Sequence, residues 1–134
     1  MPLASLRAKY QTRSDRRART VSFLEEVRSQ ILEREPGLEV TWHTGDEAPG
    51  KEITDAIDWK RGGSAACVVT LGINVLGTPE IILVPLHVVD DDARNGHLVF
   101  VAGNVAQGHR TASNVAYSVI LHADKLVEAY LATW

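Results

Sequence analysis

The sequence predicts an α+β fold: a two-layer sandwich in which a mainly antiparallel four-stranded sheet is flanked by a long N-terminal helix and a C-terminal helix. Apolar residues recur at helical spacing near both ends of the chain, and they follow strand patterns in the segments between. The last three strand segments are joined by short turn-forming stretches, which favours antiparallel hairpins. A chain of 134 residues fits a single domain spanning residues 1–134.

The long N-terminal helix is predicted over about residues 14–34. Its apolar stripe recurs every three or four positions and comprises Val21, Leu24, Val27 and Ile31. Pro36 and Gly37 end the helical pattern. Ser22 and Glu25 match a capping box, so a break between this helix and a preceding short one is expected at residues 20–22.

Residues 1–20 are predicted to form a basic N-terminal arm or short helix, with Leu3, Leu6 and Tyr10 spaced as on one helix face. This segment carries six basic residues against one acidic residue, a net charge of +5, whereas the whole chain has a net charge of −3. Nucleic acid is therefore a possible partner, with contacts from Arg13, Arg16, Arg17 and Arg19. Docking on an acidic patch of another copy or partner, or a solvated helix face, explains the same charges.

Four strand segments are predicted, at residues 38–44, 65–75, 80–89 and 97–103. The first alternates apolar and polar residues, which is typical of a strand with one buried face. The connection over residues 45–64 is long, and one or two helical turns are expected within its KEITDAIDW stretch. Residues 90–96, rich in Asp, Asn and Gly, are predicted to be a hairpin loop.

The segment 80–89 is apolar at both strand parities, so both of its faces need cover. A single layer of two helices covers one sheet face only. The predicted interface with a second copy or a protein partner therefore comprises Ile81, Leu83, Pro85 and Val89. Because proline lacks a ladder donor, Pro85 is expected to place this strand at a sheet edge or at a bulge.

The C-terminal helix follows the segment GNVAQGHRT, residues 103–111, whose glycine spacing is that of the first part of a phosphate-binding loop. His109 and Arg110 stand where such a loop carries Lys and Ser or Thr, and no later strand follows, which excludes that type of nucleotide hydrolase. A milder hypothesis is an anion site at the helix start, made by Arg110, Thr111 and Ser113. Ser113 or Asn114 acting as a plain helix cap explains the same residues.

Weak candidates for acid–base chemistry are His87 or His109 as the acid or base, with Asp90 orienting that histidine. Asp90 or Asp92 is also a candidate partner for His97, across the predicted hairpin. The spacing of the histidines and aspartates matches no metal-ligand motif, so no metal and no cofactor is expected. Whether the fold gathers His43, His87 and His109 at one end of the sheet is left open by the sequence.

Composition indicates in which cellular compartment the protein is expected. Apolar residues make up 45% and charged residues 23% of the chain, and no apolar stretch reaches the length of a membrane span, so no membrane association is expected. The start of the chain does not resemble a secretory signal. Cys67 is the single cysteine and lies in an apolar run, which is typical of a buried core residue in a cytoplasmic protein.

Three functional hypotheses follow. The first is a non-catalytic, oligomeric interaction protein, such as an adaptor, inhibitor, immunity-type or structural accessory protein of a bacterium or phage, that binds a protein partner through an apolar sheet surface. The second is a small enzyme or binding domain for an anionic metabolite that uses Arg110 and His109 at a helix N-terminus. The third is nucleic-acid binding through the basic N-terminal segment.

Overall fold

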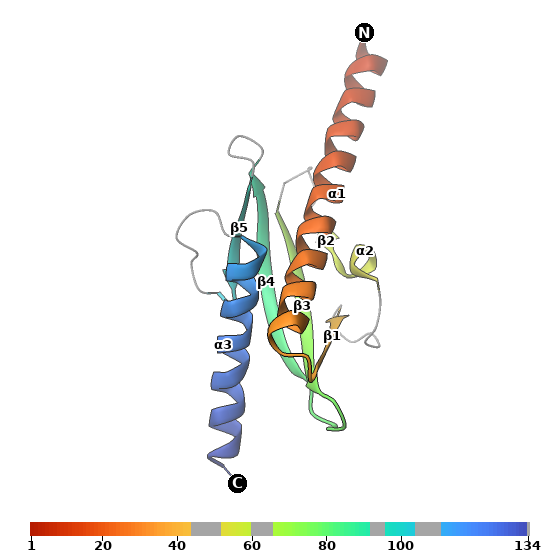
Figure 1. Ribbon diagram of the computed structural model, residues 1–134. Helices are drawn as coiled ribbons and strands as arrows, with labels where there is room; N and C mark the ends of the chain where they lie inside the picture. The colour runs from red at the N-terminus through yellow and green to blue at the C-terminus, as the bar shows by residue number, and fades with distance from the viewer. Residues whose placement is uncertain (44–51, 60–65, 92–95, 104–110, 134) are drawn as a thin grey trace.

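The computed structural model describes residues 1–43, 52–59, 66–91, 96–103 and 111–133 (Figure 1). It confirms a two-layer α+β arrangement with a long N-terminal helix, an antiparallel sheet and a C-terminal helix. The elements in chain order are α1 (Pro2–Arg34), β1 (Leu38–His43), α2 (Ile53–Ala56), β2 (Asp58–Trp59), β3 (Ala66–Val75), β4 (Ile82–Asp91), β5 (Gly96–Val101) and α3 (Ala112–Leu131).

The sheet has the order β1-β3-β4-β5, and every neighbouring pair is antiparallel. The β3–β4 hairpin is its centre, with a register that runs from Ala66 opposite Val89 to Ile73 opposite Ile82. The two-residue strand β2, which the sequence does not predict, pairs with the start of β3. Strand β4 also continues through Asp91, into the predicted hairpin loop, because Asp90 pairs with His97 in the β4–β5 ladder.

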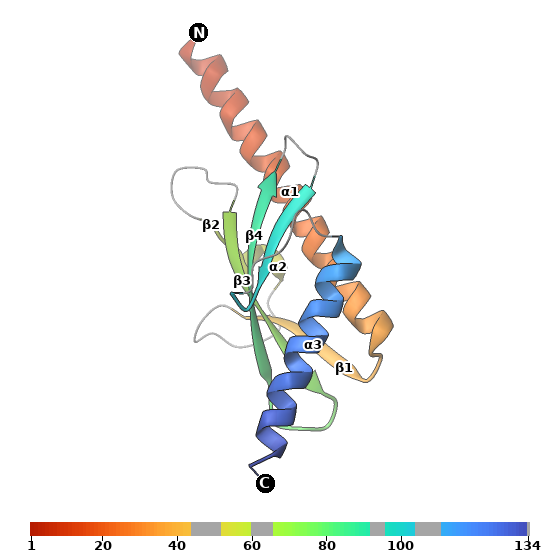
Figure 2. The ribbon, with the colours of Figure 1, turned by 90° about the vertical axis from the view of Figure 1, so that its left-hand side faces the viewer.

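All three helices lie on the same face of the sheet (Figure 2). Alternate side chains of the strands point into the space between the two layers, which holds the hydrophobic core. The largest fully buried side chains are Trp42, Leu24, Ile31, Leu71, Ile73 and Leu86. Burial of this one sheet face by amphipathic helices is the main source of stability of the fold.

Helix α1 is continuous over 33 residues, so the predicted break at residues 20–22 is wrong. Thr20 is fully buried and stands in line with Leu24, Val27 and Ile31, which pack against the sheet. Ser22 is exposed and makes no cap. The stripe therefore passes through the expected break, and packing on the sheet keeps the backbone helical there.

Pro85 lies on β4, which is interior in the strand order but has an open edge at this residue, so the expected edge position holds locally. The Pro85 carbonyl accepts a hydrogen bond from the Ala102 N–H at 2.8 Å, and the ring nitrogen of the same residue faces the same side. The ladder between β4 and β5 ends one residue further on, at Leu86 opposite Val101. Proline therefore stands where the ladder needs no donor, and in the described part of the chain Ile82–Pro85 has no strand beside it on that side.

Candidate functional site

The sheet face opposite the helices is the first candidate surface, and we call it the open sheet face. The register places one row of side chains across it, from Val68 on β3 through His87 on β4 to Phe100 on β5. Leu83 is 51% exposed and Val68 is 40% exposed, although both belong to the central strands of the sheet. The described residues of this face are Glu39, Thr41, His43, Val68, Thr70, Gly72, Asn74, Leu83, Pro85, His87, Val89, Gly96, Leu98 and Phe100.

The predicted interface residues lie on this surface or at its end. Ile81 is 43% exposed just before β4, Leu83 and Pro85 are exposed, and Val89 is half-buried. The opposite parity of β4 is buried under the helices, with Val84, Leu86 and Val88 all inaccessible to solvent. Within the described residues, the two apolar faces of β4 therefore have different environments: one is core and one is surface.

His87 lies among apolar neighbours near the middle of the open sheet face. Its ring centroid is 5.6 Å from that of Phe100, with the planes tilted by 37°. The Nε2 atom is buried and has no hydrogen-bond partner among the described residues. A nitrogen without a partner in apolar surroundings costs free energy unless another group satisfies it.

His43 is held by its own strand. Its Nε2 atom lies 3.0 Å from Thr41 Oγ1, and its ring covers Gly72 on the neighbouring strand. His43 and His87 share the open sheet face but stand on strands that β3 separates. His109, the third histidine of the possible cluster, lies outside the described residues. No group of three or more metal-ligating side chains occurs in the part of the chain that the structure describes.

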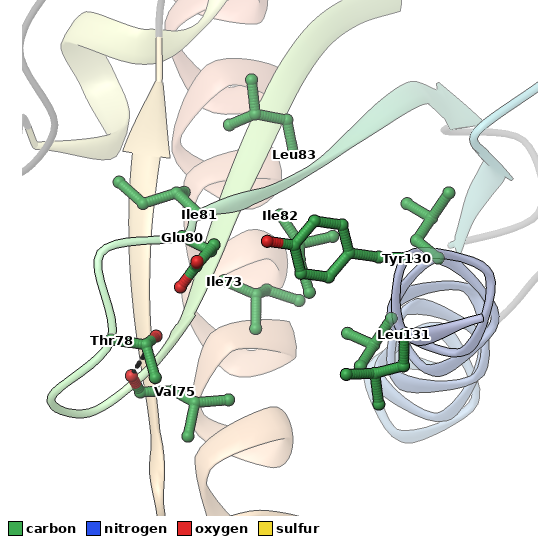
Figure 3. Close-up of a pocket in the computed structure, with 11 residues that line it drawn as sticks. Ile73, Val75, Thr78, Glu80, Ile81, Ile82, Leu83, Tyr130 and Leu131 are labelled. Atoms are coloured by element: carbon green, nitrogen blue, oxygen red, sulfur yellow. Dashed lines mark hydrogen bonds between the residues drawn. The ribbon is translucent and has the colours of Figure 1, made fainter. Parts of the chain in front are cut away.

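A groove of about 730 Å³ runs between the C-terminal half of α3 and the end of the β3–β4 hairpin (Figure 3). The Tyr130 ring reaches from α3 toward Ile82, and Thr78, Glu80 and the Tyr130 hydroxyl are the polar groups of an otherwise apolar lining. The groove begins where Ile82–Pro85 has an open edge, so α3 and the hairpin do not close on each other there. The lining residues are Ile73, Val75, Thr78, Glu80, Ile81, Ile82, Leu83, Leu126, Val127, Tyr130 and Leu131.

Asp90 is the centre of a polar cluster on the helix side of the sheet. Arg19 Nη2 lies 2.8 Å from Asp90 Oδ2, and Arg16 Nε lies 4.0 Å from the same oxygen. His97 Nε2 lies 3.4 Å from Asp90 Oδ1 and 3.3 Å from Thr20 Oγ1. The imidazole of His97 also stacks on Phe23 with ring centroids 4.4 Å apart. The cluster fastens the middle of α1 to the β4–β5 hairpin.

This cluster changes the roles expected from the sequence. Asp90 does not orient His87, because the two side chains have opposite parity on β4 and lie on opposite faces of the sheet. The expected pairing of Asp90 with His97 is confirmed. Of the four arginines considered for nucleic acid, Arg16 and Arg19 approach Asp90, and Arg13 and Arg17 are exposed.

The N-terminus of α3 is capped by its own residues. Thr111 is the N-cap, and its Oγ1 accepts a hydrogen bond from the Asn114 N–H at 3.2 Å. The cap is therefore Thr111 and not Ser113 or Asn114. Ser113 Oγ instead accepts a hydrogen bond of 2.8 Å from Arg34 Nη2, which joins the end of α1 to the start of α3. Arg110 lies outside the described residues.

Cys67 is fully buried in the core, and burial raises the pKa of its thiol to about 11. In the described residues, no helix is both long enough and apolar enough to span a bilayer. Neither a protein-family model, nor a curated protein, nor a solved structure matches this chain. The class that the structure defines is a two-layer α+β domain with one covered and one open sheet face.

Proposed function

We propose that this protein is a non-catalytic interaction protein, an adaptor or structural accessory component, that acts as an assembly of identical copies. Its contact surface is the apolar area that begins at Ile81 and Leu83 and extends over the open sheet face and the adjoining groove. These two residues belong to both surfaces, so the groove and the open sheet face are continuous.

The observation that carries the proposal is the exposure of Leu83 on β4, in the stretch that pairs with β3 but has no described strand on its other side. Core strands of monomeric proteins are usually covered on every apolar face, and contiguous exposed apolar patches mark interaction sites. Leu83 stands 51% exposed between exposed Ile81 and Pro85, and Val68, 40% exposed, lies on the same face further along β3, opposite His87. An apolar centre with a more polar rim, here Glu39, Thr41 and His43 on the edge strand β1, is the usual composition of a protein interface.

The environments of the titratable residues support the same proposal. The Asp90 carboxylate is occupied by Arg19 and His97, and His43 is bonded to Thr41. These groups stabilise the fold through intramolecular contacts. Oligomer formation through apolar surface is the function class that fits exposed apolar side chains with few charged residues among them.

Light scattering coupled to size-exclusion chromatography tests the proposal, using concentrations up to about 100 μM, where micromolar complexes are populated. The expected result is an oligomer that Val68→Glu and Leu83→Glu convert to monomer, because each buries a carboxylate in the contact. Ser22→Glu, at an exposed position of α1, is the matched control and leaves the mass unchanged. Circular dichroism verifies that each variant is folded, and a monomeric wild-type protein would contradict the proposal.

A further inference from the structure

The first 14 residues of α1, Pro2–Asp15, extend away from the rest of the molecule, and we call them the N-terminal arm. Every side chain in the arm is exposed, and the first buried residue of α1 is Thr20. Both views show the arm continuing beyond the end of the sheet (Figures 1 and 2). The described remainder of the chain does not cover it.

The arm carries its large apolar side chains on one face. Leu3 is 73%, Leu6 is 51% and Tyr10 is 62% exposed. Their spacing of three and four residues continues through positions 13 and 17 into the buried stripe of the same helix, which comprises Thr20, Leu24, Val27 and Ile31. The face of α1 that packs on the sheet is therefore the face that carries Leu3, Leu6 and Tyr10 beyond it.

The arm extends the packed part of α1 without packing of its own against the described residues. Most helices in proteins are stabilised by packing of their apolar face, and the arm lacks this contribution. The arm has no acidic residue in its first turn and no side-chain N-cap to offset this. Its apolar stripe is thus exposed and not covered by the described residues, on a helix that a partner would stabilise.

The groove between α3 and the β3–β4 hairpin is the complementary surface. Grooves of this kind bind amphipathic helices through anchors at positions i, i+3 and i+7, the spacing of Leu3, Leu6 and Tyr10. The arm carries Arg7, Lys9 and Arg13 against Asp15. The groove includes Glu80, and the adjoining turns of α3 carry Asp124 and Glu128 beside Lys125, so the charges are complementary.

The arm and the groove of one molecule lie at opposite ends, so the arm does not reach its own groove (Figure 1). We propose that the N-terminal arm of one copy docks in the groove of a second copy. Two antiparallel copies bring each arm beside the partner's groove, and the repeated contact closes a two-fold dimer. This inference rests on the proposed self-association and identifies the segment that drives it.

Cross-linking between two variants, each with one introduced cysteine, tests the docking directly. Leu6→Cys, on the apolar face of the arm, is mixed with a tagged Leu131→Cys in the groove, and a short bismaleimide links neighbouring thiols. Native Cys67 does not interfere because it is fully buried and its thiol stays protonated. The expected product is the arm–groove heterodimer. Ala8→Cys, on the opposite face of the same helix, is the matched control and gives much less of it.

The dimer dissociation constant provides a second measurement. Leu6→Glu is expected to raise it by about tenfold or more, the loss expected for one buried leucine side chain, and Ala8→Glu leaves it unchanged. Equal cross-linking from Leu6→Cys and Ala8→Cys, or arm–arm products in excess of arm–groove products, would overturn the docking. If Val68→Glu dissociates the oligomer and Leu6→Glu does not, the docking is wrong and the proposed function stands. A monomeric wild-type protein rejects both.

Discussion

Arg19 Nη2 and Asp90 Oδ2 are 2.8 Å apart, and this ion pair joins the middle of α1 to the end of β4. The Asp90 side chain is 3% exposed, whereas that of Arg19 is 46% exposed. The carboxylate is therefore the buried member of the pair, and it depends on its partners for the hydrogen bonds that water would otherwise supply. The contact lies close to the point where the N-terminal arm leaves the body of the protein.

Asp90→Ala is expected to lower the free energy of unfolding by about 1–3 kcal/mol, because it removes the acceptor shared by Arg19 and His97 and leaves their nitrogen atoms without it. Urea unfolding followed by circular dichroism measures the loss. The control is Asp124→Ala, which removes an exposed carboxylate from α3 and is expected to change stability by less than about 0.5 kcal/mol. Equal effects of the two substitutions would show that the Asp90 cluster does not hold α1 in place.

Gly72→Ala is expected to displace the imidazole of His43. A Cβ atom at position 72 would overlap the Nε2 and Cδ2 atoms of His43, so the ring has to move and its hydrogen bond with Thr41 is lost. The expected cost is about 1–3 kcal/mol of stability. The double variant Gly72→Ala/His43→Ala recovers most of it, because the overlap is gone.

Gly37→Ala is the matched control for the glycine substitution, since no atom lies within 4 Å of a Cβ built there. It is expected to leave stability unchanged or slightly higher, as fewer unfolded conformations remain accessible. Thermal unfolding of the wild type, Gly72→Ala, His43→Ala and the double variant completes a double-mutant cycle. Additive effects of Gly72→Ala and His43→Ala would contradict the close approach of the two residues.

Thr111→Ala is expected to destabilise the protein by about 1 kcal/mol, because the Asn114 N–H loses the side-chain oxygen that caps α3. Thr111→Ser retains the hydroxyl and keeps most of the stability. The same pair distinguishes a cap from an anion site. Addition of inorganic phosphate is expected to raise the melting temperature of wild type and Thr111→Ser no more than that of Thr111→Ala, and a selective rise would support the anion site instead.

Cys67 is expected to resist thiol reagents in the native state and to react fully in denaturant. With the pKa of the thiol raised to about 11, about one thiol in a thousand is ionised at pH 8, and the residue is also fully buried. Absorbance during reaction with a disulfide reagent measures both rates. Rapid modification of the folded protein would show that the core around β3 opens readily.

The same thiol makes stability depend on alkaline pH. A pKa that is higher in the folded state favours the neutral thiol, so this contribution is complete below the ordinary thiol value of about 8.5 and is lost as the pH rises toward 11. Unfolding at pH 7 and pH 10 is therefore expected to differ more for the wild-type protein than for Cys67→Ala. The difference between the two proteins removes the contribution of the other groups that titrate in this range, because both proteins contain them.

Most of the elements could be predicted from local patterns. Strands β1 and β3 agree with the predicted segments 38–44 and 65–75 to within one residue at each end, because alternation and turn residues bound them. The capping-box pattern at Ser22 predicted a helix break that does not occur. Such a four-residue pattern carries no information on the packing of Thr20 against the sheet, which keeps α1 continuous. The sequence likewise did not show on which side of β4 the open edge at Pro85 lies. That depends on the β4–β5 pairing, which ends at Leu86 opposite Val101.

The candidate site depended more on long-range contacts. The two-sided apolar pattern of residues 81–89 was visible in the sequence, but which parity faces the helices was decided by packing. The partners of Asp90 come from residues 71 positions earlier and seven positions later, and the earlier one has no local signal. The groove has no sequence signature at all, because its walls come from a hairpin and a helix that are distant in the chain.

By itself, the sequence determined which segments become helices and strands, that they form two layers, and that β4 is apolar on both sides, because these properties follow from the periodicity of neighbouring residues. Only the tertiary structure decided that α1 is a single helix, that Asp90 fastens it, and that Leu83 remains exposed beside a groove. These features depend on distances between residues far apart in the chain, and such distances are fixed only when the helices and the sheet pack together.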